Sequence, residues 1–312
     1  MAQMVATVGI DVSKLWLDVA VWPTREEIRV SRDAAGLAVL IGWLSEHGVM
    51  RVGLEASGGY EREAIDTLQA AGFEVALLNA LRVRRFAEAK GRLAKNDRVD
   101  ARTVAQFTAV IVEEVPPQRR RDLDALTELL TYRRQLKSWC TDCTNQLEHL
   151  RDTALRKVIA QRQASFERDL AKIDKQVADL LAEHNDWNAL ARRLRTVPGV
   201  GPVVSASLIA LLPELGTLSR RAIASLVGLA PFDDDSGGRQ GERHIKGGRK
   251  TVRDALYMAA LSARQHNPLI AAFAKRLAGK KPKVIITACM CKLLVMLNAM
   301  VRDGTDWRAA AA

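Results

Sequence analysis

Short apolar runs and helical patterns alternate along the first third of the chain. The runs Val5–Asp11 and Leu15–Trp22 predict two strands joined by a turn at residues 12–14. Strands come first and then alternate with helices, an order that predicts a mixed sheet flanked by helices. The further elements expected from the same patterns are strands at 28–31, 51–55 and 74–78, and helices at 34–47, 62–71, 83–89 and 99–110.

A long polar stretch with regularly spaced leucines follows Pro116-Pro117, which end the first domain. From Leu123 to Leu180 these leucines recur near heptad or helical spacing, and Asn185-Asp186 interrupts the pattern. The stretch therefore predicts two antiparallel helices, or a helical hairpin that meets a second protomer. A solvent-exposed arm without a partner is the alternative interpretation.

The last part of the chain opens with a glycine turn, VPGVGP at 197–202, followed by an apolar helix predicted at 203–212. This pattern is typical of a helix-hairpin-helix motif, whose backbone N–H groups bind phosphate, although an ordinary tight turn has the same appearance. The apolar stretch 284–301 is interrupted by Lys292 and Asn298, so it predicts a buried helix rather than a membrane span. The predicted domains are 1–115, 116–192 and 193–312, the last mostly α-helical.

Basic residues exceed acidic ones, with 47 Lys and Arg against 36 Asp and Glu and a formal net charge of +11. Hydrophobic residues make up 48% of the 312 residues, which excludes a disordered chain. The basic excess favours a nucleic-acid partner, and a basic protein without one is the alternative. We predict that nucleic acid is bound by two turn glycines and by a run of cations: Gly199, Gly201, Arg239, Arg243, Lys246, Arg249, Lys250 and Arg253.

The four cysteines do not have the spacing of a zinc site. Cys140-x-x-Cys143 has no matching second pair, and Cys289-x-Cys291 is a poor match. Both pairs lie in helical patterns, which predicts reduced core cysteines and a reducing, cytoplasmic compartment. The N-terminal residues show no signal peptide.

Four carboxylates stand where predicted strands end and a predicted helix begins. Asp11 and Glu55 end strands, and Asp97 and Asp100 are three apart near a helix start, hence on one face. Charges at the ends of buried strands are costly unless compensated, and four carboxylates suit two Mg²⁺ (or Mn²⁺) ions that clamp a phosphodiester. Alternatively, Asp97 is only a helix cap and Asp100 only a partner for a nearby arginine. Asp18, in mid-strand, is expected to point to solvent. The order of these acids suits a ribonuclease H-like fold.

Ser236 lies in a glycine-rich basic loop, FDDDSGGRQGERHIKGGRK. A serine hydroxyl attacks phosphate only when a base or metal activates it and cations hold the developing charge. His244 is a candidate helper, and a plain turn serine is the alternative. Ser57, the rival nucleophile, is expected to form the loop after Glu55. The candidate cations are Arg239, Arg243, Arg249 and Arg253.

Five ordered motifs together resemble the DEDD insertion-sequence transposases, which are bridge-RNA-guided recombinases with a RuvC-like N-terminal domain. The motifs extend over almost the whole chain: GIDVSK, GLEASGGY, KNDRVDA, VPGVGP and GLAPFDDDSGG…IKGGRKTVRDALYMAALSA…NP. By resemblance, Asp11, Glu55, Asp97 and Asp100 bind metal and Ser236 is the nucleophile. The run Asp233-Asp234-Asp235 before this serine is more acidic than expected beside a phosphate.

The resemblance also implies a coiled-coil middle domain, a C-terminal transposase domain, and assembly into dimers and tetramers. In such assemblies the serine of one protomer acts beside the acids of another. A non-coding guide RNA pairs with donor and target DNA.

We therefore predict a bacterial DNA transposase, cytoplasmic and nucleoid-associated, with no membrane partner. It cuts and rejoins strands through a covalent serine–phosphate intermediate assisted by Mg²⁺. The first alternative is a structure-specific endonuclease, similar to junction resolvases, which uses the same acids with water as nucleophile. A basic nucleic-acid-binding scaffold needs neither the acids nor the serine. An actin-like kinase would need a second glycine-rich phosphate loop, which the sequence lacks.

Overall fold

The computed structural model describes residues 6–91, 97–111, 121–232, 241 and 243–308, and for residues 97–99 it describes the backbone alone. The chain divides into two compact units, Met1–Arg120 and Arg121–Ala312.

The first unit is built on a five-stranded sheet with the order β3-β2-β1-β4-β5. The strands are β1 (Thr7–Val12), β2 (Trp16–Trp22), β3 (Glu27–Ser31), β4 (Arg51–Glu55) and β5 (Glu74–Leu78). β2 pairs antiparallel with β1 and β3, whereas β4 pairs parallel with β1 and β5. The predicted mixed sheet is thereby confirmed.

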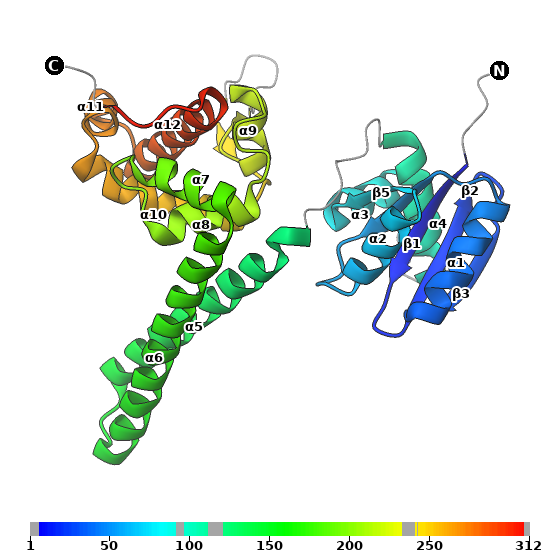
Figure 1. Ribbon diagram of the computed structural model, residues 1–312, viewed down its shortest axis with the longest axis horizontal. Coiled ribbons are helices and arrows are strands. Elements are labelled where there is room, and N and C mark those ends of the chain that lie inside the picture. The colour runs from blue at the N-terminus through cyan, green and yellow to red at the C-terminus, as the bar shows by residue number, and fades with distance from the viewer. Residues whose placement is uncertain (1–5, 92–96, 112–120, 233–240, 242, 309–312) are drawn as a thin grey trace. The chain divides into compact units, whose positions relative to one another are not determined.

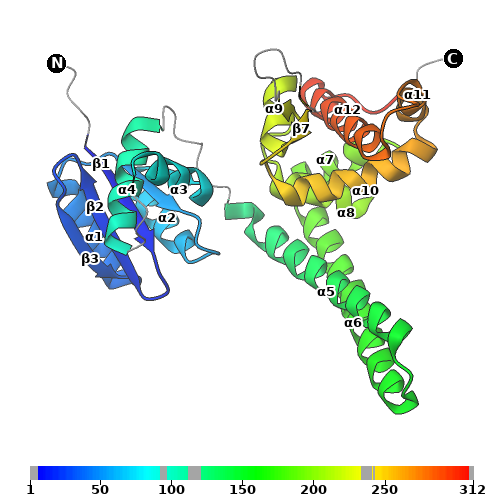
Figure 2. The ribbon, with the colours of Figure 1, turned by 180° about the vertical axis from the view of Figure 1, so that it is seen from behind.

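Helices cover both faces of this sheet (Figures 1 and 2). They are α1 (Ala34–Glu46), α2 (Glu61–Ala70), α3 (Ala80–Ala89) and α4 (Asp97–Ile111). Val8 and Ile10 of β1 pack in one core with Leu40 of α1 and Leu68 of α2. The other face carries α4, which crosses β1 and shares a smaller core with β5 and α3. This three-layer arrangement is compatible with a ribonuclease H-like domain.

Two glycines let α4 lie directly on the sheet. A Cβ atom at Gly9 would overlap the backbone of Ala101 and Ala105, and one at Gly53 would overlap the Thr108 hydroxyl. Such a close approach of backbone to backbone requires glycine. The position of α4 over β1 is therefore fixed by residues within β1 and β4 themselves.

The second unit begins with a helical hairpin of α5 (Asp124–His149) and α6 (Thr153–Glu183), preceded by a 3₁₀ turn at Arg121–Leu123 (Figure 1). Across the hairpin, Arg133 Nε donates to Asp174 at 2.5 Å. The turn lies at 150–152, and Asp152 caps α6 by accepting from the Leu155 N–H at 2.7 Å. The antiparallel pair was predicted but the position of its turn was not.

A helical bundle completes this unit, with α7 (Asn185–Arg195), α8 (Pro202–Leu211), α9 (Arg220–Val227), α10 (Lys250–His266), α11 (Pro268–Arg276) and α12 (Pro282–Asp303). The hairpin β6 (Pro231–Phe232) and β7 (His244–Ile245) stands between α9 and α10. Leu126 and Leu130 of α5 belong to the same hydrophobic core as the bundle.

α12 is the central apolar helix of the bundle. By length and composition it is the one helix in the described part of the chain that could cross a membrane. Leu293, Leu294 and Leu297 are fully buried in the bundle core, as predicted for a buried helix. Asn298 is also buried, and its side-chain amide forms two hydrogen bonds with the backbone of the loop after α8. It accepts one from Gly216 N–H at 2.8 Å and donates one to Leu218 C=O at 2.9 Å.

Candidate catalytic acids and basic surface

Asp11 and Glu55 lie side by side at the C-terminal ends of two neighbouring parallel strands, which is the sheet edge where both strands end. Ile10 of β1 lies opposite Leu54 of β4, so the next residue on each strand is one of the two acids. Because side chains alternate along a strand, both acids share the face of Gly9 and Gly53, which is the face that α4 covers. Both are partly buried.

The first turn of α4 contains the other two predicted acids. α4 begins at Asp97, two residues before the predicted range of 99–110, and Asp100 comes one residue before Ala101. Ala101 lies over Gly9, which is two residues before Asp11 on the same strand face. Asp100 is partly buried, and the side chain of Asp97 is outside the described residues.

The donor chemistry of these four residues fits a hard divalent cation, because all four are carboxylates and Mg²⁺ prefers oxygen ligands. Among the side chains that the structure describes, no three from His, Cys, Asp and Glu are grouped closely enough to hold a metal ion. Asp11, Glu55 and Asp100 are among those described, so these three are not close enough together in this structure to hold an ion as a group, and the convergence of the full set stays a prediction.

Asp18 does not point to solvent, and that expectation was wrong. It is only 4% exposed and lies directly opposite Asp11 in the β1–β2 pairing. Both oxygens of its carboxylate accept hydrogen bonds from Arg29 on β3, at 2.8 Å from Nε and 2.8 Å from the terminal nitrogen. Side chains do alternate along β2 as expected, but the face that carries Asp18 is covered by α4 and is not exposed to solvent.

The loop after β4 is organised by Glu61, which sequence reasoning missed. Its carboxylate accepts from the Ser57 N–H and hydroxyl, both at 3.0 Å, and from the Gly59 N–H at 2.8 Å. Burial alone would raise the pKa of Glu61, but these hydrogen bonds hold it below its ordinary value. Gly58 and Gly59 have positive φ angles of 76° and 111°, which glycine adopts without strain. Ser57 thus has the predicted loop-forming contacts.

The two glycines of the turn between α7 and α8 have different surroundings. A Cβ atom at Gly199 would lie 2.7 Å from the backbone N of Ala263 in α10, so packing accounts for this glycine. A Cβ at Gly201 would meet open space, and Gly201 caps α8 with extended backbone. Gly201 is therefore the better placed of the two to meet a ligand.

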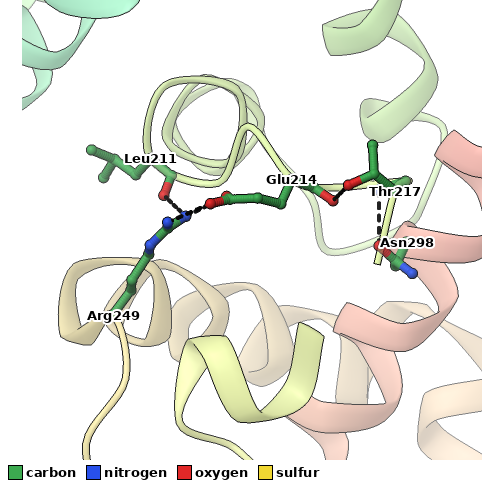
Figure 3. Close-up of polar contacts among 6 residues, drawn as sticks. Leu211, Glu214, Thr217, Arg249 and Asn298 are labelled. Carbon is green, nitrogen blue, oxygen red and sulfur yellow. Dashed lines mark hydrogen bonds and ion pairs between the residues drawn. The ribbon is translucent and has the colours of Figure 1, made fainter. Parts of the chain in front are cut away.

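The predicted cations fall into three groups. Arg239 lies outside the described residues, as does Ser236. Arg249 forms a two-pronged ion pair with Glu214, at 2.5 and 2.6 Å, and also donates to Leu211 C=O at 3.1 Å (Figure 3). Arg253 donates to Val227 C=O at 2.8 Å and to Gly247 C=O at 2.5 Å. Arg249 and Arg253 are thus engaged in holding the bundle together.

The other cations of this run face solvent. Lys250 pairs with Asp254 at 2.7 Å on the surface of α10. Arg243 and Lys246 flank β7 and are exposed. Arg243 also lines a groove of about 940 Å³ between the β6–β7 hairpin, α11 and α12, whose other cations are Arg220, Lys283 and Lys292.

Comparison with known proteins relates both units to transposases. A family described as "Transposase" matches residues 8–155, and the family described as "Transposase IS116/IS110/IS902 family" matches residues 191–275. The pilin gene-inverting proteins of Moraxella lacunata and Moraxella bovis are each 26% identical over 312 residues, covering 95% of this chain and 96% of the relative. An uncharacterized 43.6 kDa protein of insertion element IS110 from Streptomyces coelicolor is 28% identical over 141 residues, 44% of this chain and 34% of that protein.

The matched segments include the acid-bearing sheet, α4, the glycine turn and the β6–β7 hairpin. Both units are thus similar to transposases of the IS116/IS110/IS902 kind, and the chain is a DNA transposase or recombinase.

Proposed function

We propose that this transposase cuts and rejoins DNA through a covalent bond between Ser236 and a DNA phosphate, with Asp11, Glu55, Asp97 and Asp100 acting in the same site. The observation that carries the acid half is the shared sheet edge. Asp11 and Glu55 lie on neighbouring parallel strands, and α4 begins on the face to which they belong. The serine half is supported by the family match, which includes residue 236, and by the resemblance of its loop to the family's nucleophile.

The proposed chemistry balances without an energy source. The Ser236 oxygen bonds to phosphorus while the bond from phosphorus to one deoxyribose oxygen breaks, and the serine proton ends on the released hydroxyl. Attack by a deoxyribose hydroxyl on the serine ester reverses these changes and restores a phosphodiester. The four carboxylates would hold Mg²⁺, which stabilises negative charge on the phosphate and favours loss of the hydroxyl proton.

Recognition of DNA is proposed to depend on a non-coding guide RNA that pairs with donor and target strands. In guided systems the protein contacts mostly backbone and shape, which suits a chain of net charge +11. Dimers and tetramers are proposed as the working assemblies, with the α5–α6 hairpin as the dimerisation arm.

An endonuclease that uses water is the second candidate, because the same four acids serve either reaction. One feature of the relatives favours a recombinase. Two of them are named for inverting a pilin gene, and inversion of a DNA segment requires that cut ends be rejoined.

Trapping distinguishes the two reactions. The protein is incubated with donor DNA, target DNA and guide RNA and then denatured, and a DNA–protein adduct is sought by gel. We expect an adduct with the wild type and with Ser57→Ala, and none with Ser236→Ala or Asp11→Asn. Asp11→Asn should still bind RNA. Cut DNA with free ends and no adduct in the wild type would refute the serine ester and favour the nuclease.

A further inference from the structure

Asp18 has an arrangement that stability alone does not explain. It is 4% exposed and stands opposite Asp11, so two acidic residues lie in register on the same face of adjacent strands. Like charges directly opposite each other destabilise a sheet. The compensating cation, Arg29, has a side chain that is 46% exposed, so the ion pair is only partly buried and contributes little to stability. An acid at position 18 therefore calls for a functional reason.

Arg29 determines where the Asp18 carboxylate points. It lies opposite Asp18 on β3 and binds both carboxylate oxygens at 2.8 Å. The row across the sheet is therefore Arg29 on β3, Asp18 on β2, Asp11 on β1 and Glu55 on β4. Asp18 is turned toward the cation on one side of it and away from the acid on the other.

There is room for Asp18 to adopt another orientation. A cavity of about 220 Å³ borders Asp18 and Arg29 beneath Ala101 of α4. Glu27 borders the same cavity and forms an ion pair with Arg102 of α4. Arg102 is therefore already paired and is not a ready substitute for Arg29. A released Asp18 carboxylate would stand opposite Asp11 and near any cation bound there.

We propose that Arg29 is a positioning residue that neutralises Asp18 and keeps it out of the catalytic acid set. This inference rests on the proposed function of Asp11 as a metal-binding acid. With Asp18 paired to Arg29, only the four proposed catalytic acids contribute uncompensated negative charge to the metal site. Loss of either partner then changes divalent-cation affinity, and the two single changes act in opposite directions.

The test measures Mn²⁺ binding to the full-length protein by isothermal titration calorimetry, with the Mn²⁺-induced rise in melting temperature as a second readout. Arg29→Gln releases an uncompensated carboxylate and should tighten Mn²⁺ binding by about three- to tenfold, as one added charge at short range predicts. Asp18→Asn removes one negative charge from the position opposite Asp11 and should weaken binding by about the same factor. The double variant should return to near the wild-type affinity, and Arg29→Lys should do the same.

Arg51→Gln is the matched control, because Arg51 makes a cross-strand ion pair with Glu74 at 2.9 Å on the same sheet, at the opposite end of β4. It should leave Mn²⁺ affinity unchanged. If Arg29→Gln and Asp18→Asn shift affinity no more than this control, or in the same direction, the inference is wrong. If both weaken DNA binding without changing Mn²⁺ affinity, Arg29 contacts DNA instead. If the Asp11→Asn variant binds Mn²⁺ as tightly as the wild type does, the proposed role of Asp11 in metal binding is wrong.

Discussion

Arg249 shows how one basic side chain of a cationic run is committed to the fold. Its guanidinium joins the start of α10 to Leu211, the last residue of α8, and to Glu214 in the segment that follows (Figure 3). We expect Arg249→Ala to lower the free energy of unfolding by about 1–3 kcal/mol, the usual effect of losing hydrogen bonds between charged groups. The neighbouring Lys250→Ala, which loses one exposed pair with Asp254, should cost no more than about 0.5 kcal/mol. Chemical denaturation at neutral pH measures both.

The pH dependence of this effect has a definite sign. Burial alone would raise the pKa of Glu214, but the hydrogen bonds from Arg249 hold it below the ordinary value of 4.5. A carboxylate whose pKa is lowered on folding stabilises the protein above its unfolded pKa, and that contribution is lost as the pH falls through the folded pKa. The stability difference between wild type and Arg249→Ala should therefore shrink below pH 4.5. A difference that stays constant down to acid unfolding would contradict this account.

Unlike Arg249, Arg243 and Lys246 are expected to matter for nucleic-acid binding more than for stability, because both are exposed beside β7. Replacing both with Ala should lower the melting temperature less than Arg249→Ala does, and it should weaken DNA and RNA binding. For every phosphate that the protein no longer neutralises, the slope of log affinity against log salt should fall by roughly 0.9. Fluorescence anisotropy across a salt series measures this slope. Arg84→Ala with Arg85→Ala, which removes two cations paired with Glu88 on α3, is the charge-matched control. Equal slopes for the two double variants would contradict a nucleic-acid role for Arg243 and Lys246.

At the scale of elements, the contact between α4 and β1 positions the candidate acids. A methyl group at Gly9 would overlap backbone atoms of Ala101 and Ala105, which cannot move without moving the helix. Gly9→Ala should therefore destabilise the protein by about 3 kcal/mol or more and abolish DNA cleavage, because α4 carries Asp97 and Asp100. Gly42→Ala in α1, where a Cβ meets open space, should instead stabilise by roughly 0.5–1 kcal/mol. Thermal unfolding and strand-cleavage assays on both variants test this, and an active, stable Gly9→Ala protein would refute it.

Elements with a clear hydrophobic period were predictable, and those without one were not. The strands of the sheet and α4 follow from apolar runs and helical spacing, and both faces of β1 are buried as its sequence indicates. The hairpin turn at 150–152 was missed because it contains neither glycine nor proline, leaving only the cap residue Asp152 as a signal. β6 and β7 have two residues each, too few to show any period.

The candidate site was predictable in its residue types and less so in its contacts. Asp11 and Glu55 could be placed at one edge because each ends an apolar strand, and parallel strands align such ends. The pairing of Asp18 with Arg29 depends on the register of three strands and on which face α4 covers, and neither is encoded locally. Similarly, the ion pair of Arg249 with Glu214 joins residues 35 apart, so a local charge run could not reveal it.

At the scale of the whole molecule, the proposed catalytic groups belong to different units. Asp11, Glu55, Asp97 and Asp100 are in the unit ending at Arg120, and Ser236 is in the unit beginning at Arg121. A complete site thus requires one unit to meet another, either within a chain or between two chains of an oligomer. The family resemblance favours two chains, and this can be tested with proteins that each lack one half of the site.

We expect a mixture of Asp11→Asn and Ser236→Ala proteins to recover the covalent DNA adduct that neither forms alone. In a dimer whose sites combine the acids of one protomer with the serine of the other, each mixed dimer holds one intact site. Random mixing should then restore about a quarter of the wild-type adduct, since about half of the dimers are mixed. The adduct should form on the Asp11→Asn chain, which a size tag on one protein reveals. A mixture that stays inactive after shared refolding, while each variant still forms dimers, would place the acids and the serine of every site in one chain.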